Sequence, residues 1–199
     1  YVLNHATLYV ESGKRTFLTG TNGAGKSTLI KAILQHAPGT FITSEARISY
    51  FSQDQDTLDP QKTVLENVTA DAVYPQHICR AVLSNLYMSR DDMFKTVSVL
   101  SGGERVKTAL AKVLVSGCNF MILDEPTRGI DVGAKYEIYC VINELAKSGK
   151  AVIVISSEMQ EVIGTCDRVY VINEGRIAGE LTKEEVTQER IMKCIMADN

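Results

Sequence analysis

Residues 20–28 read GTNGAGKST, a glycine-rich turn that leads into a lysine and two hydroxyl residues. Glycine lets the backbone turn tightly and bring its N–H groups close to an anion, and a helix that begins near Lys26 adds the positive end of its dipole. Lys26 supplies a positive charge for the outer phosphates of a triphosphate, and Ser27 supplies a hydroxyl ligand for Mg²⁺. The residues that we expect to contact the nucleotide here are Asn22, Gly23, Ala24, Gly25, Lys26, Ser27 and Thr28.

The sequence on either side of this loop supports a phosphate site. Residues 15–19 (RTFLT) are typical of a short buried strand, and residues 27–36 are typical of a helix that ends before Pro38. A strand, a loop and a helix in this order form the context that a phosphate-binding loop requires. A glycine-rich turn without a ligand is the less favoured alternative.

Four more apolar runs, rich in residues that favour strands, alternate with helical patterns. They are residues 47–51, 119–123, 151–155 and 168–172. This alternation predicts an α/β fold with a parallel sheet covered by helices. Residues 173–175 (NEG) indicate a hairpin to an antiparallel edge strand, and residues 132–148 predict a helix with Asp131 as its N-cap.

The stretch from residue 54 to about residue 100 has no strand-like run. Helical patterns at residues 64–73 and 78–87 instead predict a small helical subdomain inserted in the core. With 199 residues and 45% hydrophobic content, the chain can bury one sizeable core. We therefore expect residues 1–199 to form a single domain with this insertion.

Composition also excludes several classes of function. The net charge is −3, which gives no electrostatic support for direct nucleic-acid binding by this chain alone. The apolar runs are far shorter than the roughly 20 residues of a membrane span, and no charged-then-apolar leader opens the chain, so we expect a soluble protein. The five cysteines are scattered and never form C-x-x-C, which indicates reduced thiols rather than disulfides or a zinc site.

Two acidic residues follow the apolar run FMIL at residues 120–123. Asp124 and Glu125 would lie at the carboxyl end of a strand, where the active sites of such sheets are found. Asp124 is suited to hold Mg²⁺ through water, and Glu125 is suited to take a proton from the water that attacks the γ-phosphorus. Gln53 follows another strand and is placed to reach the metal or that water. A solvated acidic turn is the alternative for the acidic pair, and the phosphate loop in the same chain makes it the less favoured one.

LSGGE at residues 100–104 has two compatible interpretations. Ser101 and Glu104 have the spacing of a capping box, which predicts a well-capped helix. Gly102 and Gly103 also leave the first amides of that helix open to an anion. The motif can therefore start a helix and bind a phosphate at the same time.

Together, GTNGAGKST, Gln53, LSGGE, FMILDEP and Asp131 resemble, in order and approximate spacing, the ATP-binding cassette superfamily over essentially the whole chain. The resemblance implies an ATPase that binds Mg-ATP at the interface of a head-to-tail dimer. Ser101, Gly102 and Gly103 of one domain would cap the nucleotide of the other, and Asp131 would communicate across the interface. The second domain is another copy or a foreign chain. The implied location is cytoplasmic, with a peripheral position at the inner membrane if a partner holds it there.

The chain departs from the family pattern at its catalytic and base-binding positions. A histidine usually follows the strand that corresponds to residues 151–155, and Ser157 stands in its place. Losing one such stabilising contact costs roughly 10²- to 10³-fold in rate, by analogy with oxyanion donors, so we expect slow hydrolysis. The family stacks adenine on an aromatic residue a little upstream of where this chain begins, and Tyr1 is the only candidate at that end.

The two parts of the chain resemble different branches of the family. Residues 1–127 resemble the ABC-F proteins, which act on ribosomes and include antibiotic-resistance factors, whereas residues 128–199 resemble the second ATPase domain of bacterial sugar importers. This suggests a recombined or engineered chain with a seam near Thr127. Three functions stay open: a ribosome-acting factor, a sugar-importer motor that docks a membrane permease through the helical insertion, and a non-catalytic nucleotide-binding module.

Overall fold

One six-stranded sheet organises the computed structural model, which describes residues 6–52 and 57–196. Its strands are β1 (Arg15–Gly20), β2 (Ile48–Phe51), β3 (Phe120–Asp124), β4 (Ala151–Ile155), β5 (Arg168–Asn173) and β6 (Arg176–Thr182). They lie in the order β2-β3-β4-β1-β5-β6. Neighbouring strands from β2 to β5 are parallel, and β6 pairs with β5 in the antiparallel direction. The predicted α/β fold with an antiparallel edge is confirmed.

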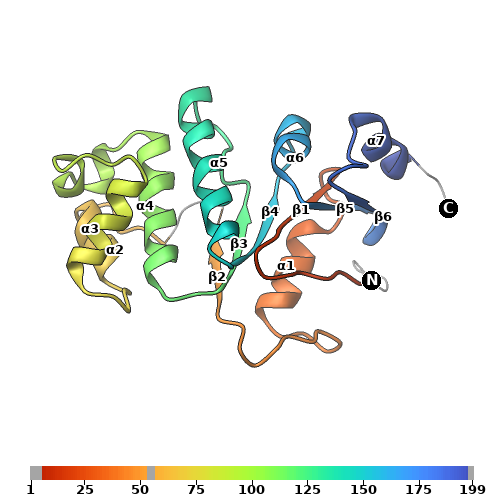
Figure 1. Ribbon diagram of the computed structural model, residues 1–199, viewed down its shortest axis with the longest axis horizontal. Coiled ribbons are helices and arrows are strands. Elements are labelled where there is room, and N and C mark those ends of the chain that lie inside the picture. The colour runs from red at the N-terminus through yellow and green to blue at the C-terminus, as the bar shows by residue number, and fades with distance from the viewer. Residues whose placement is uncertain (1–5, 53–56, 197–199) are drawn as a thin grey trace.

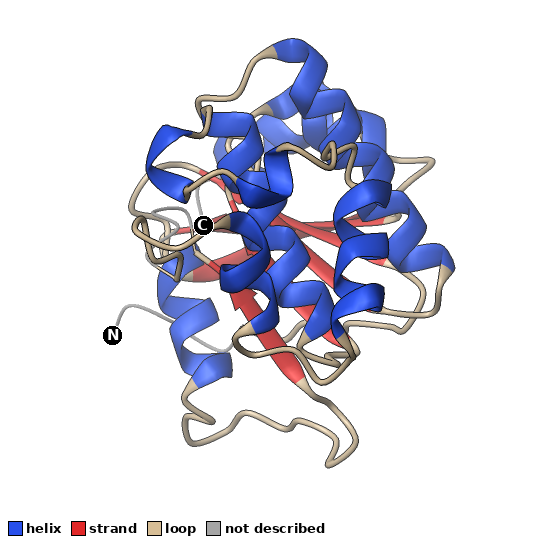
Figure 2. Cartoon of the chain, turned by 90° about the vertical axis from the view of Figure 1, so that its left-hand side faces the viewer, coloured by secondary structure: helices blue, strands red, loops and turns tan. Residues whose placement is uncertain are grey.

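Helices cover both faces of this sheet. They are α1 (Lys26–Leu34), α2 (Val64–Thr69), α3 (Gln76–Asn85), α4 (Gly102–Val115), α5 (Val132–Lys147), α6 (Met159–Thr165) and α7 (Gln188–Met196), with 3₁₀ turns at Asp92–Phe94 and Val97–Val99. Figure 1 shows α2, α3 and α4 gathered at one end of the molecule, beyond the β2 edge of the sheet. Figure 2, viewed from that end, shows helices in front of the strands. No helix in the described ranges is long and apolar enough to cross a membrane.

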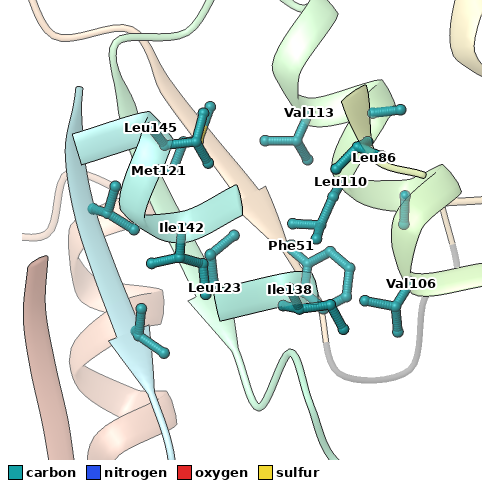
Figure 3. Close-up of a cluster of buried hydrophobic side chains, with 14 of the residues drawn as sticks. Phe51, Leu86, Val106, Leu110, Val113, Met121, Leu123, Ile138, Ile142 and Leu145 are labelled. Carbon is teal, nitrogen blue, oxygen red and sulfur yellow. The ribbon is translucent and has the colours of Figure 1, made fainter. Parts of the chain in front are cut away.

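Alternate side chains of the strands build a core on each face of the sheet, because successive residues of a strand point to opposite sides. Phe51, Met121 and Leu123 face α5, where they meet Ile138 and Ile142 (Figure 3). The opposite face packs on α1 through a second buried cluster: Leu18, Ile122, Ile153, Ile155, Tyr170 and Ile172 with Ala24, Leu29, Ile30 and Ile33. Burial on both faces explains why the parallel strands read as continuous apolar runs.

Two predicted local features are confirmed by backbone geometry. The side chain of Asp131 accepts a hydrogen bond of 3.0 Å from the backbone N–H of Ala134, so it caps α5. Between β5 and β6, Glu174 and Gly175 have φ angles of 47° and 74°. Two consecutive left-handed residues form the turn that suits the twist of a two-residue hairpin.

The helices of the predicted insertion have different bounds from those expected. The pattern at residues 64–73 corresponds to α2, which ends at Thr69. The backbone N–H of Val73 instead donates to the carbonyl of Val115 at 2.9 Å, so a tertiary contact ends the helical run. The pattern at residues 78–87 corresponds to α3, which begins two residues earlier, directly after Pro75.

The cysteines agree with the expectation of free thiols. Cys79, Cys118 and Cys166 are buried, and Cys140 and Cys194 are partly buried. Within residues 6–52 and 57–196, no group of three metal-binding side chains gathers from histidine, cysteine, aspartate and glutamate. Any metal held by the described residues therefore needs other ligands as well.

Candidate active site

The loop between β1 and α1 turns through glycines in conformations that other residues rarely adopt. The φ angles of Gly20, Gly23 and Gly25 are 150°, 80° and 109°. A Cβ on Gly20 would lie 2.0 Å from the carbonyl oxygen of Ile172, so only glycine lets the loop pack against β5. A Cβ on Gly23 would meet nothing within 4 Å, so the loop faces open space at this position.

Lys26 is the first residue of α1, and its side chain folds back into the loop. The ammonium donates hydrogen bonds to the carbonyls of Gly20, at 2.8 Å, and Thr21, at 3.0 Å. Burial lowers the pKa of Lys26, while the carboxylates of Glu125 and Asp124 act in the opposite direction. The predicted phosphate-binding charge therefore lies in the loop and within electrostatic reach of the two acids.

The other nucleotide residues predicted in the loop lie around this lysine. Asn22 and Gly23 are exposed, and Ser27 and Thr28 expose the first turn of α1. Ala24 is buried, and its carbonyl accepts a hydrogen bond of 2.8 Å from Gly175 in the β5–β6 hairpin. The hairpin thus supports the back of the loop while its front stays open.

Strand register brings the acids to the same edge of the sheet as the loop. Leu18 of β1 pairs with Ile155 of β4, and Ile155 pairs with Asp124 of β3. The carboxyl ends of three parallel strands therefore align, which is where ligands bind in open α/β sheets. Asp124 is 8% exposed and accepts a hydrogen bond of 3.0 Å from the hydroxyl of Tyr50.

Glu125 leaves the strand in an uncommon backbone conformation. Its φ angle is 48°, and its backbone N–H donates to the carbonyl of Ile155 at 3.0 Å. A left-handed conformation at a non-glycine residue costs about 1–3 kcal/mol, and residues that adopt it cluster at functional sites. The hydroxyl of Ser157, two residues beyond β4, donates a hydrogen bond of 3.2 Å to the carboxylate of Glu125. Two of the three predicted catalytic residues are thus in contact, and the third, Gln53, lies outside the described residues.

LSGGE forms the capping box that its spacing predicts. The backbone N–H of Ser101 donates to the Glu104 carboxylate at 2.7 Å, and the backbone N–H of Glu104 donates to the Ser101 hydroxyl at 3.3 Å. A Cβ on Gly103 would lie 3.0 Å from the Cβ of Ala134, so α4 packs closely on the start of α5. Figure 1 shows α4 and α1 on opposite sides of α5 and β3. The chain does not bring Ser101, Gly102 and Gly103 to its own phosphate loop.

Two further polar residues at this edge were not predicted from the sequence. Tyr50 sits inside an apolar strand, where a tyrosine looks like an ordinary core residue. Glu161 of α6 is buried and accepts hydrogen bonds from Thr127 and Ser156, which flank the site on two different segments. Its partners are far apart in the sequence, so no spacing signals the contact.

Comparison with known proteins gives relatives for nearly the whole chain. A family model described as "ABC transporter" matches residues 3–128. The L-arabinose transport ATP-binding protein AraG of Geobacillus stearothermophilus is 34% identical over 98% of this chain and 44% of its own length. The ribose import ATP-binding protein RbsA of Clostridium tetani is 38% identical over 94% of this chain and 43% of its own length. The xylose import ATP-binding protein XylG of Geobacillus kaustophilus is 58% identical over 49% of this chain and 19% of its own length.

The chain therefore spans less than half of the length of these curated relatives. Among solved structures, the fold is similar to that of the ATP-binding cassette MJ0796 in a dimeric, post-hydrolysis state bound to ADP and phosphate. That match has a TM-score of 0.78 at 20% identity and covers 92% of this chain and 91% of that chain. An ATP-binding subunit of an ABC transporter matches with the same TM-score of 0.78, at 21% identity, over 98% of this chain and 89% of that chain.

Proposed function

We propose that this chain, which belongs to the ABC transporter family, is an ATPase module that drives the import of a sugar. The observation that carries the ATPase part is the alignment of β1, β3 and β4, which brings Lys26, Asp124, Glu125 and Ser157 to one edge of the sheet. The names of the relatives support the sugar, because they are ATP-binding proteins for arabinose, ribose and xylose uptake.

The residues at this edge fit Mg-ATP. The loop is open to a ligand at Gly23, and Lys26 can exchange two carbonyl contacts for phosphate oxygens. Ser27 and Asp124 offer the hydroxyl and carboxylate oxygens that Mg²⁺ prefers. Bound there, Mg²⁺ neutralises negative charge on the β- and γ-phosphates.

Glu125 acts as the base in this proposal, and Ser157 limits the rate of hydrolysis. A serine hydroxyl carries a single proton, so Ser157 can donate to Glu125 or to the γ-phosphate, but not to both. Its hydrogen bond to Glu125 therefore leaves the γ-phosphate without this donor. This competition supports slow hydrolysis. They also keep open a module that binds ATP without hydrolysing it.

A second cassette completes the site in this proposal. Ser101, Gly102 and Gly103 begin α4, which lies on the other side of α5 from the chain's own phosphate loop (Figure 1). A head-to-tail partner, either a second copy or a foreign cassette, would place these residues on the nucleotide held by Lys26. Asp131, which caps α5 beside them, would then lie at the interface.

We place the permease contact at a groove between the helical insertion and α5. The groove encloses about 710 Å³, and its lining includes Tyr74, Ile78, Tyr87 and Val141. Tyr74 and Tyr87 are 45% and 61% exposed, so a partner can contact both. Through this contact the chain would sit on the cytoplasmic side of the inner membrane.

Uptake of labelled arabinose, ribose and xylose by the parent organism tests the importer function. The Glu125→Gln variant at the native locus should abolish uptake of at least one of these sugars. Unchanged uptake of all three, with Glu125-dependent ATP hydrolysis retained by the purified wild-type chain, would contradict the importer and leave the ATPase standing.

The two-branch origin remains a separate hypothesis. Identity reaches 58% over 98 residues with one xylose-import relative but is 34% when nearly the whole chain is aligned with AraG. Part of the chain is therefore more similar to one importer protein than the chain as a whole is to another. The named relatives favour the importer over an ABC-F-type ribosomal role, and co-sedimentation with ribosomes in the presence of ATP would be the observation that reverses that preference.

A further inference from the structure

Glu161 is a buried carboxylate that three different segments of the chain hold in place. It lies on α6 and is 6% exposed. One carboxylate oxygen accepts hydrogen bonds from the hydroxyl of Thr127, at 2.6 Å, and the ammonium of Lys135, at 3.2 Å. The other oxygen accepts a hydrogen bond of 2.7 Å from the hydroxyl of Ser156.

Two of these donors, Thr127 and Ser156, lie close in the sequence to residues of the candidate active site. Thr127 follows Glu125 by two residues, in the turn where the backbone N–H of Arg128 donates to the carbonyl of Glu125 at 3.2 Å. Ser156 directly precedes Ser157. Both donors are almost completely buried, at 1% and 0% exposure, so water cannot replace the carboxylate that they contact.

The third donor connects the same carboxylate to α5. Lys135 also contacts Glu158 on the segment after β4, and its backbone N–H donates to the carbonyl of Asp131 at 3.0 Å. Lys135 therefore lies one helical turn from the N-cap of α5, where the second cassette is expected. Glu161 joins the turn after β3, the turn after β4 and the start of α5 in one polar unit.

We propose that Glu161 is a positioning residue for ATP hydrolysis, because its carboxylate fixes the turns that carry Glu125 and Ser157, and the contact between their side chains then orients Glu125 as the base. The inference rests on the proposed ATPase function. Burial alone would raise the pKa of Glu161, but the hydroxyls of Thr127, Tyr139 and Ser156 and the ammonium of Lys135 lower it below the ordinary value. The carboxylate is thus ionised at neutral pH and able to accept from Thr127, Ser156 and Lys135.

A double-mutant cycle between Glu161→Gln and Ser157→Ala tests the proposal. The amide of glutamine has only one accepting oxygen, so it cannot serve donors at both ends. In the otherwise wild-type chain, Glu161→Gln should lower kcat for Mg-ATP about tenfold and change KM less than about twofold. If Glu161 acts through the contact between Ser157 and Glu125, the same substitution should lower kcat less than about threefold in the Ser157→Ala background.

Asp167→Asn is the matched control. Asp167 is a partly buried carboxylate that accepts its hydrogen bonds from one residue, Arg15. It directly precedes β5, at the amino ends of the parallel strands, whereas the site lies at their carboxyl ends. The Asp167→Asn substitution should lower the melting temperature and leave kcat unchanged. An equal loss of kcat in Asp167→Asn would show that the effect of Glu161→Gln reports stability alone, and would overturn the proposal.

A second pair of variants covers the case in which Glu161→Gln does not fold. Thr127→Val keeps the shape of the side chain and removes the hydroxyl, whereas Thr127→Ser keeps the hydroxyl and removes a methyl group. We expect kcat to fall in Thr127→Val and to stay near the wild-type value in Thr127→Ser. Equal kcat values in the two variants would overturn the proposal.

The outcomes separate this inference from the proposed function. A wild-type chain whose hydrolysis is no greater than that of Glu125→Gln overturns both. An active wild-type chain in which Glu161→Gln lowers kcat by the same factor in both backgrounds overturns the positioning role and leaves the ATPase intact.

Discussion

The hydroxyl of Ser157 donates a hydrogen bond of 3.2 Å to the carboxylate of Glu125, and we attribute the proposed slow hydrolysis to the serine at this position. A hydroxyl donates one proton and carries no charge, whereas an imidazolium adds positive charge beside a transition state that gains negative charge. A serine at this position therefore leaves the proposed site without the positive charge that a histidine would add. Lys26 is then the principal positive charge that the described residues of this chain offer at the loop.

Ser157→His should therefore raise kcat for Mg-ATP by roughly 10- to 100-fold, since it restores one charged donor of the oxyanion-stabilising kind. KM should change little, because the loop contacts of the nucleotide are left as they are. Steady-state ATPase kinetics of the variant, with Ser157→His/Glu125→Gln as the inactive control, measures this. A kcat equal to the wild-type value would show that Ser157 does not limit the reaction.

At the residue scale, the sequence predicts what local spacing can encode. Lys26 and Ser27 follow their glycines within one motif, and Asp124 and Glu125 follow an apolar strand, so a single stretch of chain reveals each. The contact between Tyr50 and Asp124 and the three contacts of Glu161 join residues that the fold alone brings together. Without strand order and register, these residues could not be distinguished from ordinary core or surface positions.

Among the elements, helices α2 and α4 both begin with a capping box, but their expected roles differ. Thr63 and Glu66 form a capping box at the start of α2, and Ser101 and Glu104 form one at the start of α4. An N-cap hydroxyl stabilises a helix by satisfying one of its free amides. Only the α4 box is followed by Gly102 and Gly103, whose amides are proposed to meet a partner's nucleotide.

Ser101→Ala and Thr63→Ala should each lower the free energy of unfolding by about 1 kcal/mol, because each removes one N-cap acceptor. ATP hydrolysis should fall in Ser101→Ala alone. Urea unfolding and ATPase rates of the two variants, compared side by side, separate the two roles. Equal hydrolysis in both would mean that LSGGE is no more than a well-capped helix in this protein.

Element types followed from periodicity, whereas the end of α2 depended on a tertiary contact. Strand β4 (Ala151–Ile155) has the predicted bounds because its apolar run is flanked by polar residues. Helix α2 ends early because Val73 bonds to Val115 and packs on Gly117, where a Cβ would lie 2.8 Å from the Val73 side chain. An apolar pattern cannot show that such a contact competes with the next helical turn.

For the whole molecule, Arg15 and Asp167 tie together the starts of two neighbouring central strands. The Asp167 carboxylate accepts hydrogen bonds from the guanidinium and from the backbone N–H of Arg15, at 2.7–2.9 Å. The hydrogen bond from the Arg15 side chain lowers the pKa of Asp167 below its ordinary value of 3.8, against the effect of burial. The pair lies away from the candidate active site, so it tests stability without touching catalysis.

Acid should weaken the wild-type protein more than Asp167→Asn. A carboxyl whose pKa is lower in the folded state contributes stability above its unfolded pKa and loses it as the pH falls through the folded value. The contribution of Asp167 should therefore be complete at neutral pH and disappear below about pH 3.8. At neutral pH, Asp167→Asn should cost roughly 1–3 kcal/mol, as expected for hydrogen bonds to a charged group. Urea unfolding of both proteins at neutral and acidic pH measures this, and identical pH dependence would contradict the linkage.

The proposed ATPase requires two cassettes, because α4 and the phosphate loop of one chain lie on opposite sides of α5 (Figure 1). Mg-ATP hydrolysis per chain, measured against protein concentration with Glu125→Gln as the control, tests this most directly. We predict a rate per chain that rises with concentration and disappears in Glu125→Gln. A rate that does not depend on concentration, or that persists in Glu125→Gln, would contradict a two-cassette site with Glu125 as its base.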